Sequence, residues 1–445
     1  MASASSQLPV SERAVVLLIA AIHFINILDF MIVMPLGPDF STSLGIPSHS
    51  MGDIAGAYTL AAATSGIAGS FFLDRFDRRK ALAVSMAGLV LATALCGLAW
   101  DLYSLLGARV VAGLFGGPAM ALSLAIVSDV VPPKRRGRAM ATVMTAFSIA
   151  SIAGVPLALE IANAGGWRAP FFSVAGLGVV VAAACIFMLP PLRQHLQTGI
   201  RPPGLAMFNL LRKPLPLLSY LSITAMMFSA FTIIPHIPGY LVFNLGYDGE
   251  PWLIELLAPL GMTPSILGPL YLVGGTLSLL VMLVVGRLTD RLGSSIVSWL
   301  GAALVITVIW FWFIDYSPVL PVMVAFMCFM GSMSVRGVPA RALDTKIPMA
   351  HERASFMSLQ SAVQHTALAG AAIMSSRILT ENADKSLQGI PTLGYIAAGF
   401  ALLLPLCVTI AERMLKRRDG GNTETLLPAG APVTAPAPVA VGTDA

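Results

Sequence analysis

The stretch from Ala14 to Pro38 constrains the fold of this chain more than any other feature. It reads AVVLLIAAIHFINILDFMIVMPLGP and is almost wholly apolar. As a helix rising ~1.5 Å per residue, it is long enough to cross a hydrocarbon core of ~30 Å. One carboxylate, Asp29, lies inside it. Because a charge at mid-membrane costs ~3 kcal/mol on insertion scales, Asp29 is expected to face a cavity or a partner rather than lipid.

Composition extends this prediction to the whole chain. Hydrophobic residues make up 56% of it and charged residues only 11%, whereas globular domains carry ~25% charged residues. This excludes most soluble classes and predicts an all-α membrane protein with twelve transmembrane helices. The predicted spans are residues 14–38, 51–72, 81–99, 101–131, 139–163, 166–190, 215–243, 262–286, 295–314, 318–340, 355–379 and 392–412.

The basic residues predict the orientation of these spans. Twenty-two of the 27 Lys and Arg side chains flank one side of the predicted membrane, and only three flank the other. Cationic loops stay in the cytoplasm, so both termini are predicted to lie there. The same loops account for the net charge of +5 without a nucleic-acid partner.

The chain is predicted to consist of two six-helix halves. A cytoplasmic N-terminus (1–13) precedes an N-terminal bundle (14–190), a cytoplasmic linker (191–214), a C-terminal bundle (215–414) and a disordered cytoplasmic tail (415–445) rich in Ala and Pro. The loops after the second and eighth spans resemble each other, as do those after the fourth and tenth. Such internal symmetry is typical of transporters built from repeated bundles.

Asp29 and Arg109 are predicted to lie at one depth. Asp29 precedes Pro38 by 9 residues and Arg109 follows Asp101 by 8, which places both ~12–14 Å below the outer surface. A carboxylate that is desolvated and also paired with a guanidinium can change protonation when a cavity opens. We therefore predict that Asp29 carries a proton. The alternative is a static ion pair between two helices.

Other polar side chains in the spans are candidates to line a substrate cavity. They are Asn26, His236, Gln360, Gln364 and His365. The alternative for each is an interhelical hydrogen bond worth ~0.6 kcal/mol, which is favoured for His23. Arg336 is a second cation within a span. It is predicted to extend toward the cytoplasm, with binding of an anionic substrate group as the alternative.

The loop motifs carry a resemblance to a known family. The first loop reads Asp74-Arg75-Phe76-Asp77-Arg78-Arg79-Lys80, and the second keeps Gly286, Asp290, Arg291 and Gly293. Arg109 to Gly113, with Asp129 and the following PPKRRGRAMA, and Gly154-Val155-Pro156 with Gly166-Trp167-Arg168 supply further motifs. Over residues 10–415 the chain resembles the major facilitator superfamily, most closely its proton-coupled drug and sugar (arabinose-type) efflux permeases.

This resemblance implies two pseudo-symmetric bundles around a central cavity that opens alternately to each side. It also implies a cytoplasmic gate that latches the inside closed. The predicted gate residues are Asp74, Arg75, Arg78, Arg79, Asp129, Asp290 and Arg291. Of these, Asp74 and Asp290 would each lie at a helix N-terminus of the opposite half, where the helix dipole favours a carboxylate.

The combined prediction is a secondary transporter, not an enzyme, that exports a small organic solute such as a drug-like compound or sugar in exchange for protons. Proton-linked uptake of a nutrient and a non-transporting receptor are the alternatives. We expect a monomer in the lipid bilayer of a bacterial inner membrane. The sequence contains no recognisable catalytic, metal or cofactor motif. Residues 249–260 are expected to form an interfacial helix or to extend the eighth span, with an outer lid as the alternative.

Overall fold

The computed structural model describes residues 11–132, 135–190, 192, 208–260, 263–315, 320–349 and 353–425. Its first part contains α1 (Glu12–Met31), α2 (Gly37–Ser43), η1 (Ser48–Ser50), α3 (Met51–Phe72), η2 (Leu73–Arg75), α4 (Arg78–Gly97), α5 (Leu102–Val130), α6 (Arg136–Ile149), η3 (Ala150–Gly154), α7 (Val155–Gly165) and α8 (Ala169–Met188). We call residues 11–190 the first half and residues 208–425 the second half.

The second half begins with η4 (Phe208–Arg212) and α10 (Pro214–Phe231). It continues with η5 (Ile234–His236), α11 (Ile237–Gly239), η6 (Tyr240–Asn244), α12 (Pro251–Leu257), η7 (Ala258–Leu260), α13 (Gly268–Leu292), α14 (Ser294–Ile309), η8 (Trp310–Ile314), α15 (Val322–Asp344), α16 (Arg353–Ile378) and α17 (Ile390–Thr425). A two-stranded antiparallel hairpin, β1 (Thr380–Glu381) with β2 (Leu387–Gln388), joins α16 to α17.

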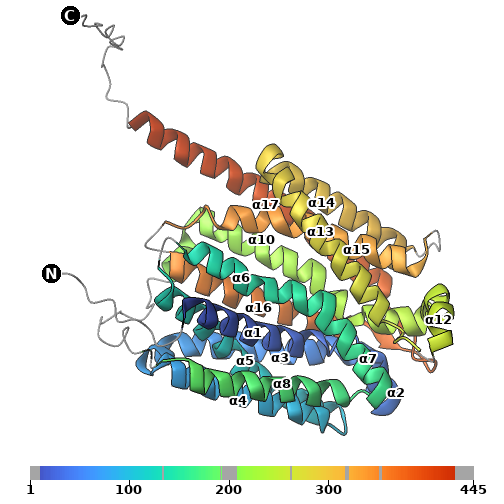
Figure 1. Cartoon of the computed structure of the whole chain (residues 1–445). Helices are drawn as coiled ribbons and strands as arrows, with labels where there is room; N and C mark the ends of the chain where they lie inside the picture. The colour runs from blue at the N-terminus through green and yellow to red at the C-terminus, as the bar shows by residue number, and fades with distance from the viewer. Residues whose placement is uncertain are drawn as a thin grey trace, which may run out of the picture.

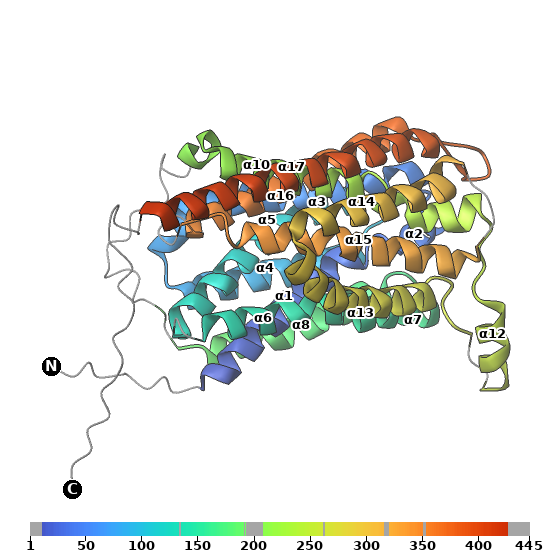
Figure 2. The same ribbon diagram turned by 90° about the horizontal axis from the view of Figure 1, so that it is seen from above.

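The long helices lie side by side and run between two ends of one elongated bundle (Figure 1). Helix α1 begins and α17 ends at the same end, while α2 and α12 lie at the other (Figure 2). Following the charge-based prediction, we call the first of these the inner end and the second the outer end. Each of the twelve predicted spans coincides with helical structure in the described residues.

Within the described residues, ten helical segments are long and apolar enough to cross a membrane. Helices α3 and α16, of 22 and 26 residues, account for the other two predicted spans and pack against each other across the two halves. Glycine allows this approach. A Cβ added at Gly52 would lie 2.0 Å from the carbonyl oxygen of Ala372, and one at Gly56 would lie 2.5 Å from Ile373.

Three predicted spans are interrupted where proline removes a backbone donor. Helix α1 ends at Met31, and residues 32–36 form turns before α2, near Pro35 and Pro38. The five π-helical residues of η3 precede Pro156 at the start of α7. In the seventh span the α-helix stops at Phe231, and the prolines of the following segment begin short helices, as the sequence predicts.

Helix α12 is separate from α13, because residues 263–267 are not helical, so residues 249–260 do not extend the eighth span. Helix α17 continues to Thr425, which is beyond residue 415, where the tail is predicted to begin. An i,i+4 ion pair of 3.1 Å between Glu412 and Lys416 supports this extension. Arg418 also donates 3.0 Å and 3.1 Å hydrogen bonds to carbonyls of residues 347 and 346. Residues 193–207 of the predicted linker and 426–445 of the predicted tail lie outside the described residues.

Candidate functional site

A buried ion pair lies at the centre of the first half. The guanidinium of Arg109 on α5 is 3.0 Å from the carboxylate of Asp29 on α1, and both residues are 0% exposed. Arg109 also donates a 3.3 Å hydrogen bond to the backbone carbonyl of Asp29. The structure therefore places the two side chains in contact, as their predicted depths allow, and does not direct the carboxylate toward lipid.

The second carboxylate oxygen of Asp29 has a partner that the sequence analysis missed. Thr93 on α4 donates a 2.7 Å hydrogen bond to Asp29 Oδ1 and another of 2.9 Å to the carbonyl of Leu89. No local pattern identifies Thr93, since it is one hydroxyl among apolar residues of α4. Helices α1, α4 and α5 together hold the carboxylate.

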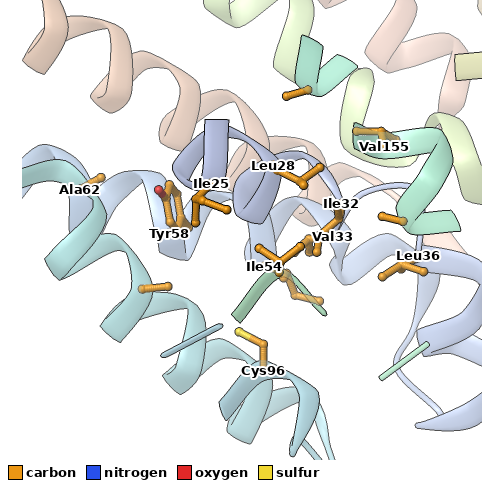
Figure 3. Packing of buried hydrophobic residues seen from close by; sticks show 14 of the residues in the cluster. Ile25, Leu28, Ile32, Val33, Leu36, Ile54, Tyr58, Ala62, Cys96 and Val155 are labelled. Carbon is orange, nitrogen blue, oxygen red and sulfur yellow. The ribbon is translucent and has the colours of Figure 1, made fainter. Parts of the chain in front are cut away.

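Tyr58 on α3 is a second residue that the sequence analysis missed. Its ring lies under the guanidinium of Arg109, 4.5 Å from the centroid, which is a cation–π contact. Its hydroxyl donates a 2.8 Å hydrogen bond to Asn26, which in turn donates one of 3.0 Å to the carbonyl of Gly116. Figure 3 shows Tyr58 beside Ile25 of α1, in the cluster of buried apolar side chains that also contains Leu28 of α1.

Both carboxylate oxygens of Asp29 are engaged, one by Thr93 and the other by Arg109, whereas the Nε of Arg109 has no hydrogen-bond partner among the described residues. Removing one partner of a buried ion pair is strongly destabilising, because the other charge is left uncompensated. The predicted cavity residue Asn26 is itself only 4% exposed and serves this network through Tyr58.

The structure corrects the prediction for Arg336. Its side chain does not extend to the cytoplasm but is 1% exposed on α15. It donates hydrogen bonds of 2.6 Å to the hydroxyl of Ser229 and 3.4 Å to the carbonyl of Met226, both on α10, and contacts the sulfur of Met333 at 3.0 Å. Among the described residues, no carboxylate forms an ion pair with it.

The candidate polar residues of the second half do not form one cluster. Gln360 is buried and donates hydrogen bonds of 2.5 Å to Asp344 and 3.4 Å to Ser219, contacts that favour the structural alternative. Gln364 and His365 are partly exposed on α16, and His365 Nδ1 lies 2.8 Å from the carbonyl of Ser361 on its own helix.

The two buried histidines have different environments. His236 is 1% exposed, and its Nε2 lies 2.8 Å from the hydroxyl of Ser375 on α16. His23 is 0% exposed, and neither ring nitrogen has a hydrogen-bond partner. The interhelical hydrogen bond favoured for His23 is therefore not found in the structure.

The inner end of the first half holds a charge network. Arg78 at the start of α4 is 2.7 Å from Asp129 near the end of α5. Asp77 caps α4 by accepting hydrogen bonds of 3.0 Å from the amide of Arg79 and 3.2 Å from that of Leu192. The carboxylate of Asp77 thus fixes the start of α4.

The remaining predicted gate residues lie close to the inner end. Arg79 also donates a hydrogen bond to the carbonyl of Ile186. Arg75, Asp290 and Arg291 are exposed, the last two on the final turn of α13. The side chain of Asp74 lies outside the described part of the structure.

The outer end joins the two halves by hydrogen bonds. Glu160 on α7 accepts bonds of 2.6 Å from the hydroxyl and 3.0 Å from the amide of Ser265. Asn163 donates a 2.7 Å hydrogen bond to the carbonyl of Thr263. We call these two contacts, Glu160–Ser265 and Asn163–Thr263, the outer clasp.

A second set of contacts closes the opposite side of the outer end. Arg377 on α16 lies 3.6 Å from Asp53 on α3, whose amide donates a 3.0 Å hydrogen bond to Ser376. Lys385 donates a 3.0 Å hydrogen bond to the carbonyl of Ser41. These contacts are consistent with a conformation whose outer end is closed.

No metal site is evident in the described residues, where no group of three or more His, Cys, Asp or Glu side chains is arranged to hold an ion. The geometry offers a buried carboxylate–guanidinium pair in the first half, a buried cation in the second half and an interface between the halves that closes at one end.

Comparison with known proteins shows which protein family has this sequence and fold. A sequence model of the Major Facilitator Superfamily matches residues 19–373. The inner membrane transport protein YdhP of Escherichia coli K12 is 29% identical over 157 residues, which cover 35% of this chain and 40% of that protein. The match thus spans less than half of that relative's length.

Two further comparisons cover more of the chain. The chloramphenicol resistance protein of Streptomyces lividans is 27% identical over 297 residues, covering 65% of this chain and 70% of that protein. The crystal structure of a point mutant of the nucleoside transporter NupG superposes with a TM-score of 0.65 at 13% identity, covering 89% of this chain and 99% of that one. At this identity the structural likeness shows the fold alone.

Proposed function

The chain belongs to the Major Facilitator Superfamily, and from this premise we propose that it exports a small organic solute in exchange for protons. Members of this superfamily are membrane transporters rather than enzymes, so the proposal concerns substrate, direction and coupling. The name of the chloramphenicol resistance protein favours export of a drug-like compound.

The observation that carries proton coupling is the pair between Asp29 and Arg109. Both residues are fully buried, and the 3.0 Å contact between them is reinforced by Thr93 and Tyr58. A carboxylate so placed is held charged by its cation and disfavoured by desolvation, so water entering from one side can change the balance. Ionisable groups inside membrane segments have functional roles by default.

Alternating access follows from the contacts between the halves. With the outer clasp formed, solute and protons would exchange at the inner end. Opening of the outer end would require the contacts of Glu160, Asn163 and Arg377 with the other half to break. We propose that Arg78 and Asp129, with Asp74, Arg75, Arg79, Asp290 and Arg291, then help to close the inner end.

Substitution of Asp29 by Asn tests the coupling. In proteoliposomes with a pH gradient, the probes are labelled chloramphenicol, which is neutral, and labelled 2-naphthoate, which is an anion. We expect the wild type to accumulate at least one of these probes and Asp29→Asn to lose this accumulation, because asparagine cannot take up and release a proton. Asp248→Asn, which changes an exposed carboxylate of the outer loop, serves as the matched control. Full pH-driven accumulation by Asp29→Asn would exclude this carboxylate as the proton carrier.

The proposal also covers the orientation of the protein in the membrane and the direction of transport. The excess of Lys and Arg at the inner end favours cytoplasmic termini, and the name of YdhP favours a bacterial inner membrane. Export then predicts proton-driven uptake of the probe into inside-out vesicles and none into right-side-out vesicles. The reverse pattern would indicate proton-linked uptake into the cell.

A further inference from the structure

Arg336 is a buried guanidinium that the proposed proton coupling does not use. Arg109 has a carboxylate at 3.0 Å, whereas the neighbours of Arg336 are a hydroxyl, a backbone carbonyl and a thioether. The Nε of Arg336 is buried without a hydrogen-bond partner among the described residues, as is the Nε of Arg109, so the missing carboxylate is what distinguishes Arg336 from Arg109. A buried cation is stabilised by an anion and by a full set of acceptors, and the described residues supply neither.

The position of Arg336 is central rather than peripheral. Its contacts lie at Met226 and Ser229 on α10. Two residues further along α10, the ring of Phe231 lies 6.1 Å from that of Phe30 on α1. Residues 226–231 span only ~7.5 Å of helix. The part of α10 that contacts Arg336 therefore lies within about two turns of the part of α10 that contacts the first half.

The contact between Phe231 and Phe30 also lies near the pair of Asp29 and Arg109. The ring of Phe30 lies 5.3 Å from that of Tyr58, and Tyr58 contacts Arg109 at 4.5 Å. The two buried guanidinium groups therefore flank one region of the interface from opposite halves. A solute bound between the halves at this depth would lie near both, but only Arg336 has no anionic partner among the described residues.

The side chains near Arg336 indicate what else a solute bound to its guanidinium would contact. Met333 is partly buried and touches the guanidinium through its sulfur, a weak acceptor on a flexible side chain. Met226 lies on the adjacent turn of α10, followed by the partly exposed Phe228 and Phe231. Thioethers and aromatic rings suit an apolar body better than a sugar, whose many hydroxyls need polar partners.

We propose that Arg336 binds the anionic group of the transported solute, and that this solute is an organic anion with an apolar or aromatic body. This inference deepens the proposed transport function and depends on it. The guanidinium offers a planar fork of donors that matches a carboxylate. In the outer-closed structure Met333 lies against this fork, and its side chain would turn aside when the ligand enters.

A binding experiment on the full-length purified protein tests the proposal without any gradient. The probes are 2-naphthoate and its neutral amide, and the readout is the ligand-dependent shift in melting temperature. We expect 2-naphthoate, but not the amide, to raise the melting temperature of the wild type. We expect Arg336→Gln to weaken the apparent affinity for 2-naphthoate at least about tenfold, as loss of one charged hydrogen bond implies.

Two variants separate binding from folding. Arg336→Lys should keep the preference for naphthoate over the amide with reduced affinity, because it retains the charge and loses the fork. Arg287→Gln, which removes an exposed guanidinium on α13, should leave the naphthoate response unchanged. Because the binding assay uses no gradient, its result does not depend on proton coupling, and a failure of coupling in the transport assay remains distinguishable from a failure of this inference.

Several results would overturn the proposal. They are equal stabilisation by naphthoate and its amide, no stabilisation of the wild type by naphthoate, or an undiminished response in Arg336→Gln. Sodium chloride and sodium phosphate form a separate arm of the same experiment. If these inorganic anions stabilise the wild type through Arg336 and naphthoate does not, the site binds an inorganic co-ion and the organic-anion assignment is wrong.

Discussion

At the scale of single residues, burial without hydrogen bonds distinguishes His23 from His236. Among the described residues neither ring nitrogen of His23 has a hydrogen-bond partner, whereas Nε2 of His236 lies 2.8 Å from the hydroxyl of Ser375. An unsatisfied buried polar group costs ~1–3 kcal/mol, and replacing it by an apolar group of similar size is neutral or stabilising. The two histidines therefore predict opposite effects of the same substitution.

We expect His23→Leu to leave the melting temperature of the purified protein unchanged or to raise it, and His236→Leu to lower it. The difference arises because leucine removes an unmet hydrogen-bonding requirement at His23 but breaks a contact between η5 and α16 at His236. Thermal unfolding of the two variants beside the wild type measures both. A marked loss of stability in His23→Leu would show that its ring has a polar partner.

At the scale of elements, helix α5 begins with a capping box. Asp101 accepts a 2.8 Å hydrogen bond from the amide of Ser104, whose hydroxyl accepts one of 3.0 Å from the amide of Asp101. These bonds hold the pKa of Asp101 below its ordinary value of 3.8. A depressed pKa in the folded state gives stability that is present above the ordinary value and lost as pH falls through the lower one.

The variant Asp101→Asn tests the direction of this pH dependence of stability, because asparagine caps the helix without titrating. We expect the wild type to melt at a higher temperature than Asp101→Asn above the ordinary pKa of Asp101, and the difference to vanish as pH falls below the folded-state pKa. Melting temperatures of both proteins over a pH series give the result. A difference that does not depend on pH would mean that the carboxylate charge contributes nothing to the cap.

The packing of α3 on α16 is a second property of elements. Because a Cβ at Gly52 would meet the carbonyl of Ala372 at 2.0 Å, while one at Gly66 meets nothing within 4 Å, these two of the four glycines of α3 form a matched pair. Overpacking costs ~1–3 kcal/mol. We expect Gly52→Ala to separate α3 from α16 at the outer end and Gly66→Ala to have no such effect.

Disulfide cross-linking between α3 and α16 measures this separation. Cysteines replacing Asp53 and Ser376, whose amide and hydroxyl are 3.0 Å apart, would report contact of the two helices in a background with the exposed Cys328 changed to Ser. Cross-linking should fall in Gly52→Ala and stay at the wild-type level in Gly66→Ala. Equal yields in the two variants would refute the role given to Gly52.

At the scale of the whole molecule, the outer clasp sets the balance between conformations. Hydrogen bonds to a charged group contribute ~1.5–3 kcal/mol each, and ~1.4 kcal/mol changes a population ratio tenfold. Glu160→Gln weakens the two bonds to Ser265 and should therefore shift the protein toward the outward-open conformation. Glu255→Gln on α12, an exposed change at the same end, is the control.

Spin labels at Ala164 and Ile266, both exposed at the outer end, measure this shift as a change in distance distribution. Longer distances should gain population in Glu160→Gln and not in Glu255→Gln. Identical distributions in all three proteins would mean that the clasp does not control opening.

The sequence by itself determined the helical fold, because a chain that must satisfy every backbone group within hydrocarbon forms long apolar helices that hydropathy reveals. It also indicated that Asp29 and Arg109 lie at one depth, since depth follows from counting residues along a helix. It overestimated continuity in the first span, where residues 32–36 form turns.

Only the tertiary structure decided which side chains meet across helices. Thr93 and Tyr58 join the charge pair from α4 and α3, and Gln360 turns to Asp344 rather than grouping with His365. Arg336 is enclosed by α10 instead of reaching the inner surface. Hydropathy gives the position of a residue along its helix, but the rotation of a helix and the identity of its neighbours depend on packing between distant segments. Those contacts determine which buried charge has a partner of opposite charge.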